Sequence, residues 1–409
     1  VSSFGPALIV AAVVLGPGSI LTSSKVGASF GYSAVPVVVA AAVLMIGMVA
    51  LGARVGVIYN TSPGAAIADR LGRPVAIGIG VILFLIVALF QQSNNIALVA
   101  GMTPIIEMIN GGEPVGFWTR VVILVAFNGF VIVCLFAMRG LYQRIEGLMK
   151  ILIGIMVVAF LANFVAVHLV APGFEREVST EPRDLIALLG LIGTTFSVGG
   201  AFYQAYLVRE KGWGLGEAKR GVVDSALSIG VLGIMTLVIL LTATRVFYGR
   251  PDPVTLAQVD DVARQLEPLF GQWAVLIFCL GIVAGALSSF LVNTIIGGTV
   301  MADSSGQGHR LSQKGPLIWT AVALLLGMTI AIATLRNKES TVALITLAQA
   351  LTVLGIPALA GALLYLGTRP ELKGERRVPR WILVLGGIGF LVSCALAIRT
   401  AFAVADKLF

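Results

Sequence analysis

Two short stretches of small, helix-breaking residues interrupt long apolar runs of this chain. The first reads Gly-Pro-Gly-Ser at 16–19, and the second reads Ser-Val-Gly-Gly at 197–200. A helix break at membrane depth leaves backbone N–H and C=O groups without helical partners, and it persists where it lines a cavity or a binding site. The chemistry that these residues offer is therefore ligand binding through backbone groups and hydroxyls.

Further polar residues near the two breaks complete a candidate substrate site. Lys25 follows Gly18 by two helical turns, so both lie on roughly the same face. A lysine within a span is a functional candidate, although snorkelling to the outer interface also explains it. The predicted substrate-binding residues are Gly16, Pro17, Gly18, Ser19, Lys25, Thr195, Ser197, Gly199, Gly200, Tyr203 and Gln204.

The composition is that of an integral membrane protein. Of the 409 residues, 58% are hydrophobic and 12% are charged, about half the charged share of a soluble domain. The net charge of +8 comes from basic residues in short loops, which indicates membrane topology rather than a nucleic-acid partner. No Ser-His, Asp-Asp or metal-ligand constellation lies within the spans, so we expect neither an enzyme nor a cofactor.

We expect an all-α polytopic fold with eleven membrane-spanning helices. Placing the N-terminus in the cytoplasm and the C-terminus outside puts most of the 28 Lys and Arg on the cytoplasmic side of a cell (inner or plasma) membrane. The predicted spans are 5–31, 33–58, 75–102, 117–138, 146–169, 185–209, 222–247, 271–301, 316–335, 341–367 and 381–403.

The two breaks lie five spans apart, which is typical of an inverted-repeat transporter with its substrate near the midplane. The alternative explanation is that glycine is common in membrane helices because it allows close packing. We predict a first repeat at 1–169, a second at 170–367 and an additional eleventh helix at 368–409.

Five motifs occur in order along nearly the whole chain: "GPGS…GASFGY", "YQRIEGLMK", "VVDSALSIG", "LEPLFGQWA…GALSS" and "LAQALTVLGIP". They resemble, in turn, the first helix, the fifth, the seventh, the approach to the eighth and the tenth helix of the Nramp family of proton-coupled divalent-metal transporters. The resemblance implies the leucine-transporter fold, a 5+5 inverted repeat in which helices 1 and 6 are discontinuous.

The chain departs from the family where the resemblance implies metal ligands and proton carriers. Gly16 and Ser19 stand at the positions of the first-helix Asp and Asn, and Ser197 stands at that of the sixth-helix Met. Gln91 and Asn94 replace the third-helix acids, and Gln349 is kept in the tenth helix. These three residues are expected to line the cavity. In sodium-coupled members of this fold, hydroxyls on the eighth helix bind Na⁺, so Gly16, Ser288 and Ser289 form a candidate sodium site.

The loss of these ligands determines the expected cargo. Divalent ions need anionic oxygen, nitrogen or sulfur ligands, and neutral hydroxyls do not offset the cost of dehydrating them. Two half-helix N-termini would instead favour a small anion. We therefore expect a transporter of a small inorganic anion, bicarbonate first, with Na⁺ as coupling ion, and the lipid bilayer but no obligatory protein as partner. The alternatives are a divalent metal (Mn²⁺ or hydrated Mg²⁺) transporter, a neutral-solute transporter and a non-transporting sensor.

Overall fold

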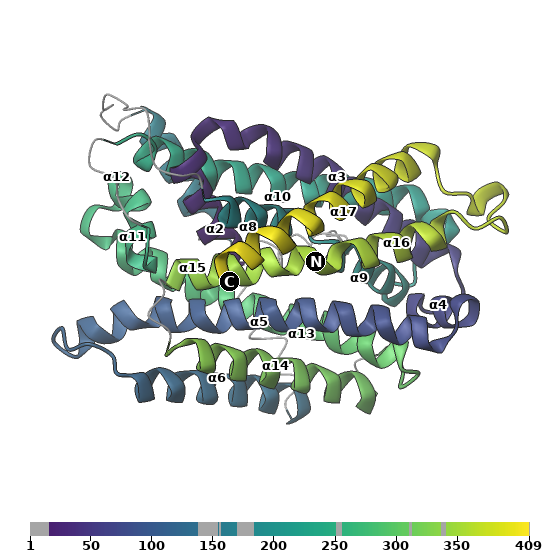
Figure 1. Ribbon diagram of the computed structural model, residues 1–409, viewed down its shortest axis with the longest axis horizontal. Coiled ribbons are helices and arrows are strands. Elements are labelled where there is room, and N and C mark those ends of the chain that lie inside the picture. Colours follow the sequence, from purple (N-terminus) through teal and green to yellow (C-terminus); the bar gives the residue numbers. More distant parts are fainter. Residues whose placement is uncertain are drawn as a thin grey trace.

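The protein is a bundle of long helices whose axes run mostly along the longest dimension of the molecule (Figure 1). The computed structural model describes residues 16–137, 154, 157–169, 184–250, 256–310, 313–336 and 341–408, and all regular secondary structure within them is helical. Each of the eleven predicted spans overlaps a described helix, and eight helical segments of the described residues are long and apolar enough to cross a membrane. The all-α, multi-pass prediction is confirmed.

The first half of the chain starts from an extended residue. Gly16 (φ −89°, ψ −177°) is the N-cap of α2, and Pro17 occupies the first helical turn, where its missing N–H has no intrahelical partner to lose. The helices that follow are α2 (Pro17–Phe30), η1 (Gly31–Ala34), α3 (Val35–Ile58), α4 (Pro63–Leu71), α5 (Arg73–Ile109), α6 (Phe117–Ala137) and the stretch Val157–Leu169.

The second half begins with a divided helix, whereas the part of the 5–31 span that precedes Gly16 lies outside the described residues. Its elements are α8 (Leu185–Thr195), α9 (Val198–Glu210), η2 (Leu215–Glu217), α10 (Ala218–Phe247), α11 (Val259–Ala263), η3 (Arg264–Leu266), α12 (Glu267–Phe270), η4 (Gly271–Trp273), α13 (Ala274–Ser304), α14 (Lys314–Thr334), α15 (Thr341–Thr352), η5 (Val353–Gly355), α16 (Ile356–Gly367), η6 (Gly374–Arg376) and α17 (Arg380–Leu408). The repeat boundaries at 169 and 367 stay a prediction.

The second break differs from the predicted one in position. It lies at Phe196 and Ser197, whose ψ angles are +55° and +80°, instead of at 197–200. The Val198 N–H donates to the Phe196 carbonyl across Ser197 (3.0 Å), an inverse γ-turn, and the helix restarts at once. Gly199 and Gly200 therefore lie in the first turn of α9 and not in the break.

A third interruption was not predicted. The helix that begins at Thr341 changes to a 3₁₀ turn over Val353–Gly355 before α16 continues it. The sequence does contain the signal, because Pro357 cannot donate a backbone hydrogen bond to the preceding turn. The span at 341–367 is thus divided into α15 and α16.

The helices form two groups that meet at the centre of the bundle. Helices α5, α6, α13 and α14 lie together in the lower part of Figure 1, and α2, α3, α8, α9, α10, α15, α16 and α17 lie above them. Helix α15 packs against α2, α5 and α8, so it joins the two groups at the level of the breaks. One apolar core cluster extends through both groups.

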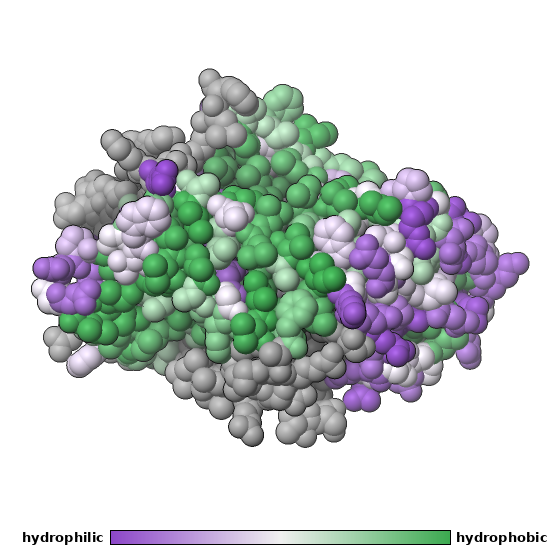
Figure 2. All heavy atoms as spheres, turned by 90° about the horizontal axis from the view of Figure 1, so that it is seen from below, coloured by the Kyte–Doolittle hydropathy of each residue, from purple (hydrophilic) through white to green (hydrophobic). Residues whose placement is uncertain are grey.

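The two ends of the bundle differ in chemistry, and each is named here after one buried residue. The Asp303 end holds α4, the last turn of α9 and the last turn of α13, and it lies on the right of Figure 1. The Gln265 end holds α11, η3 and α12, on the left. Figure 2 shows a hydrophobic middle and a hydrophilic Asp303 end, the pattern of a protein with a lipid-facing belt.

Candidate substrate site at the helix breaks

The start of α2 contacts three neighbouring helices. Gly285 of α13 lies against Pro17, because a Cβ on Gly285 would be 3.5 Å from the proline ring. A Cβ on Gly18 would overlap the carboxamide of Gln349, so that amide lies directly over the backbone of α2. The Gln349 Nε2 in turn donates to the Ser93 hydroxyl (2.8 Å). The structure therefore brings Gly18, Ser93 and Gln349 together from α2, α5 and α15.

The second break lies beside the same amide-bearing helix. Gly190 and Gly193 of α8 pack on the backbone of α15, where a Cβ on either would be 2.8 Å from the carbonyl oxygen of Thr346 or Gln349. Thr195 ends α8 two residues later and is buried. The carbonyl end of α8 and the N–H end of α9 both meet at this break, so it presents helix-dipole ends of both signs.

Several buried polar atoms at and near the breaks have no hydrogen-bond partner among the described residues. An unsatisfied buried polar atom costs about 1–3 kcal/mol, and in native structures such atoms are usually satisfied by water or a ligand. Among the predicted site residues they are Gln91 Oε1, Asn94 Nδ2, Thr195 Oγ1, both amide atoms of Gln204, and Gln349 Oε1. This set is the strongest indication of a bound ligand.

The amides of this set do not all face one point. Gln349 lies over Gly18, whereas the Gln91 Nε2 donates to the Phe290 carbonyl of α13 (2.9 Å). Gln204 is fully buried on α9 beside Gly52 of α3. The centre of the candidate site is therefore Gly18, Ser93 and Gln349, and Thr195 lies at the end of α8, which packs against α15. Ser93 was not named among the predicted site residues, although it lies between Gln91 and Asn94, which were.

Lys25 does not lie at the breaks. Its Nζ is 2.8 Å from the Asp184 carboxylate at the N-cap of α8, towards the Gln265 end, and substrate binding by Lys25 stays a prediction. The two half-helices α2 and α8 run side by side there. An ion pair with a residue 159 positions away was not predictable from the spacing along one helix.

Hydroxyls of α2 also turn away from the site. The Thr22 and Ser23 hydroxyls donate to the carbonyls of Gly18 (2.7 Å) and Ser19 (2.6 Å), one turn before each. Ser19 itself is buried. These bonds tie the Thr22 and Ser23 hydroxyls to their own helix, so Thr195 Oγ1, the unpartnered amides and the backbone groups remain as the candidate ligands.

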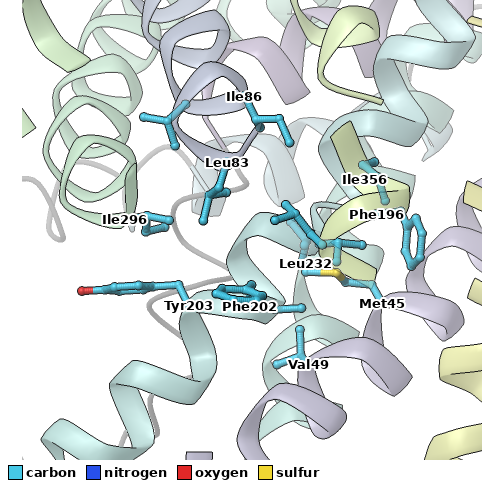
Figure 3. Packing of buried hydrophobic residues seen from close by; sticks show 14 of the residues in the cluster. Met45, Val49, Leu83, Ile86, Phe196, Phe202, Tyr203, Leu232, Ile296 and Ile356 are labelled. Atoms are coloured by element: carbon cyan, nitrogen blue, oxygen red, sulfur yellow. The ribbon is translucent and has the colours of Figure 1, made fainter. Parts of the chain in front are cut away.

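Apolar side chains fill the space between the breaks and the Asp303 end. Figure 3 shows Leu83, Phe202, Tyr203 and Ile296 around the start of α9, and a Cβ on Gly199 would lie 2.8 Å from Leu83 Cδ1. Tyr203 stacks on Tyr206, with ring centroids 5.7 Å apart. Tyr203 and Gly199 therefore belong to an apolar barrier beside the site.

The candidate sodium site is only partly described. The side chain of Ser288 lies outside the described residues. Ser289 is buried on α13, one turn after Gly285, and this face of α13 is the one that meets Pro17. Sodium binding by Gly16, Ser288 and Ser289 stays a prediction. Within the described residues, no three His, Cys, Asp or Glu side chains gather as a metal site.

The chain resembles a known protein family and several named proteins. Residues 7–403 match the family model described as Nramp, natural resistance-associated macrophage protein-like. A protein of Verminephrobacter eiseniae named divalent metal cation transporter MntH is 24% identical over 96% of this chain and 86% of its own length. The MntH of Pectobacterium carotovorum is 27% identical over 94% and 90%.

Solved structures share the arrangement of helices. A crystal structure of the Eremococcus coleocola manganese transporter has a TM-score of 0.72 at 18% sequence identity, covering 98% of this chain and 86% of the other. Mhp1, a nucleobase-cation-symport-1 family transporter in a closed conformation, has a TM-score of 0.61 at 13% identity, covering 98% and 93%. These likenesses confirm the expected leucine-transporter-type fold.

Proposed function

We propose that this chain, which belongs to the Nramp family, carries a divalent metal cation across the membrane by alternating access, with the ion held at the two helix breaks. The family is one of transporters, and the MntH relatives align over most of both lengths. The expectation of a small inorganic anion such as bicarbonate as cargo and partner is wrong, because these relatives are named for divalent metal cations and none of the proteins compared above is named for an anion.

The physical reason for the error lies in the second break. Two half-helix N-termini would favour an anion. In the structure α8 ends at Thr195 and directs its carbonyl end to the break, and such ends coordinate cations in transporters with divided helices. Because helix ends of both signs meet at the second break, the helix dipoles do not favour an anion over a cation.

The observation that carries the proposal is a pair of buried oxygens without partners. Thr195 Oγ1 and Gln349 Oε1 are both inaccessible to solvent and unpaired among the described residues. They come from α8 and α15, which pack together beside Gly18. Oxygen atoms with free lone pairs are the ligands that hard cations prefer.

The neutrality of these ligands determines how the metal would be bound. Hydroxyls and amides do not replace the full hydration shell of a 2+ ion, so the ion keeps several water molecules that bridge it to the protein. Mg²⁺ loses water reluctantly and usually keeps such waters. Hard ions such as Mg²⁺ and Mn²⁺ are thus favoured over softer metals, which prefer nitrogen and sulfur ligands.

We also propose that the Asp303 end faces the cytoplasm of a cell membrane. Four arginines of this end bond to neighbouring loop or helix-end groups: Arg54, Arg70, Arg73 and Arg209. An excess of Lys and Arg is typical of the cytoplasmic side. The C-terminal helix α17 begins at the same end and would finish outside.

Two adjacent threonines allow a matched test of the site. The Thr195 hydroxyl is unpartnered, whereas the Thr194 hydroxyl already donates to the Leu191 carbonyl (2.9 Å). Thr195→Val should raise the KM for ⁵⁴Mn²⁺ uptake into proteoliposomes about five- to tenfold, the effect of losing one hydrogen-bonding ligand. Thr194→Val should change it less than about twofold.

Competition by other ions tests whether the cargo is a divalent metal. Unlabelled Mg²⁺ should compete with ⁵⁴Mn²⁺, and Gln349→Glu, which supplies a carboxylate of the same shape, should lower the KM for Mn²⁺ at least about tenfold. The proposal is overturned if neither Mn²⁺ nor Mg²⁺ is taken up, or if ¹⁴C-bicarbonate is taken up in their place. It is also overturned if the two threonine variants behave alike.

A further inference from the structure

We propose that Tyr206 and Asp303 are positioning residues of the transport cycle, which hold α9 against α4 and α13 and thereby keep the Asp303 end closed. This inference rests on alternating access but not on the identity of the cargo. The starting point is a buried carboxylate that the candidate site does not use. Asp303 is 5% exposed, in the last turn of α13.

Neutral donors from two other elements surround this carboxylate. Asp303 Oδ1 accepts from the Ser62 hydroxyl (2.6 Å), and Oδ2 accepts from the Gly64 N–H (2.8 Å) and the Tyr206 hydroxyl (2.7 Å). Ser62 is the N-cap of α4, so the carboxylate lies at the positive end of that helix. The three bonds join α13, α4 and α9 at one point, here called the Asp303 cluster.

The fit at this point excludes a larger residue at position 64. A Cβ on Gly64 would overlap Asp303 Oδ2, so only glycine lets the carboxylate approach the backbone of α4 this closely. The Gly64 N–H also lies 3.2 Å from the Tyr206 hydroxyl. Both groups therefore depend on the same carboxylate, and losing one bond disturbs the others.

A second contact holds the same end of α9. The Arg209 guanidinium donates to the carbonyls of Tyr59 and Asn60, directly after α3 ends. Tyr206 and Arg209 are three residues apart and so share one face of the helix. Two contacts almost one turn apart fix the direction of α9 and not only its position.

Helix α9 connects these contacts to the candidate site. It runs without interruption from Val198 at the break to Glu210, about 20 Å at the usual rise of an α-helix. The side chains of Phe202 and Tyr203 on this helix belong to the apolar barrier between the two regions (Figure 3). Any movement of α9 that opens the barrier must also pull the Tyr206 hydroxyl away from Asp303.

The test measures how readily the apolar barrier opens, with no metal present. Cys134, Cys279 and Cys394 are replaced by Ala, and Ala201→Cys places a thiol at a buried position of α9, directly before the barrier residue Phe202. The labelling rate of this thiol by a maleimide is measured in detergent micelles. Tyr206→Phe, which keeps the ring, should raise that rate at least about tenfold, because a hydrogen bond to a charged group is lost.

Two controls separate positioning from general loosening. Tyr365→Phe removes a hydroxyl that accepts from Arg369 (3.0 Å) at the same end, and it should leave the rate within about twofold. Leu266→Cys, in place of Ala201→Cys, reports on the Gln265 end, where Leu266 is buried. Tyr206→Phe should not change labelling at that position.

Each outcome decides the inference. Unchanged labelling at position 201 in Tyr206→Phe overturns it, and so does an equal increase at positions 201 and 266, which would make the cluster a structural brace. Ser62→Ala provides a milder second variant with the same expected direction should Tyr206→Phe fold poorly. Since the assay contains no metal, a failure of metal uptake would overturn the proposed function and leave this inference standing.

Discussion

Different kinds of hydrogen bond hold the helices together at the two ends of the bundle. At the Gln265 end the Gln265 Nε2 donates to the Ser24 hydroxyl (3.0 Å), and the Asn163 Nδ2 donates to the Gln265 backbone carbonyl (2.7 Å). All three residues are fully buried and neutral. At the Asp303 end a carboxylate accepts three bonds from neutral donors.

This difference predicts unequal resistance to opening. A hydrogen bond to a charged group contributes about 1.5–3 kcal/mol, against about 0.5–1.5 kcal/mol between neutral groups. A buried carboxylate that loses its donors is also costlier than an amide that does so. In an alternating-access protein the Gln265 end should therefore open more readily than the Asp303 end when no cargo is bound.

Removing the carboxylate should have the largest effect. Asp303→Ala leaves the Ser62 and Tyr206 hydroxyls buried without their acceptor and leaves the Gly64 N–H with only its longer bond to the Tyr206 hydroxyl (3.2 Å). It should lower the free energy of unfolding by about 4 kcal/mol. Asp303→Asn keeps one carbonyl oxygen and should cost about half as much. SDS titration of the protein in mixed micelles measures both. If Asp303→Ala lowers the free energy of unfolding by less than Gln265→Ala, the Asp303 end is not the more strongly held of the two.

The matching change at the other end should be milder. Gln265→Ala removes the side-chain bonds to Ser24, but the Ser24 hydroxyl retains the Ile20 carbonyl as acceptor (2.8 Å). The Asn163 bond goes to the backbone and persists. The expected loss is about 1–2 kcal/mol in the same titration. Faster labelling of Leu266→Cys in this variant, without a change at position 201, would show that each end opens independently.

The Lys25–Asp184 ion pair near the Gln265 end should contribute still less to the free energy of unfolding. The Lys25 and Asp184 side chains are 20% and 32% exposed, and partly exposed pairs are screened by solvent and salt, so Lys25→Met should cost no more than about 1 kcal/mol. Thermal unfolding at low and high salt measures this. Metal uptake by Lys25→Met should equal that of the wild type, and a loss of uptake would return Lys25 to the substrate site.

The smallest effect is expected in the exposed loop at the Asp303 end. The backbone N–H of Glu371, together with Arg70 and Arg369, holds the pKa of that carboxylate below its ordinary value. Since the folded-state pKa is lowered, the stabilisation is complete above the unfolded pKa of about 4.3 and disappears as the pH falls through the folded value. The difference in unfolding temperature between wild type and Glu371→Gln should be small at pH 7 and vanish at low pH. A difference in unfolding temperature that grows as the pH falls would contradict a lowered pKa of Glu371 in the folded state.

Other features at this end could have been found from sequence only in part. Asp303 and Tyr206 were not among the predicted residues, although a carboxylate within the last turn of a span is a recognisable signal. Their pairing joins positions 97 residues apart.

The division of the 341–367 span was also predictable only in part. Pro357 marks this division in the sequence, but the short 3₁₀ turn before it depends on how α15 and α16 pack.

The sequence by itself determined the class of protein, the eleven expected spans, the start of a helix at Gly16-Pro17 and a break within the span at 185–209. Those features depend on local properties, namely the length of apolar runs and the inability of Gly-Pro-Gly to continue a helix. Only the tertiary structure decided where the second break ends, that Lys25 pairs with Asp184, that the Gln349 amide lies over Gly18 and that Asp303 joins three helices. These depend on side chains far apart in the chain, whose proximity no pattern of spacing along one helix contains.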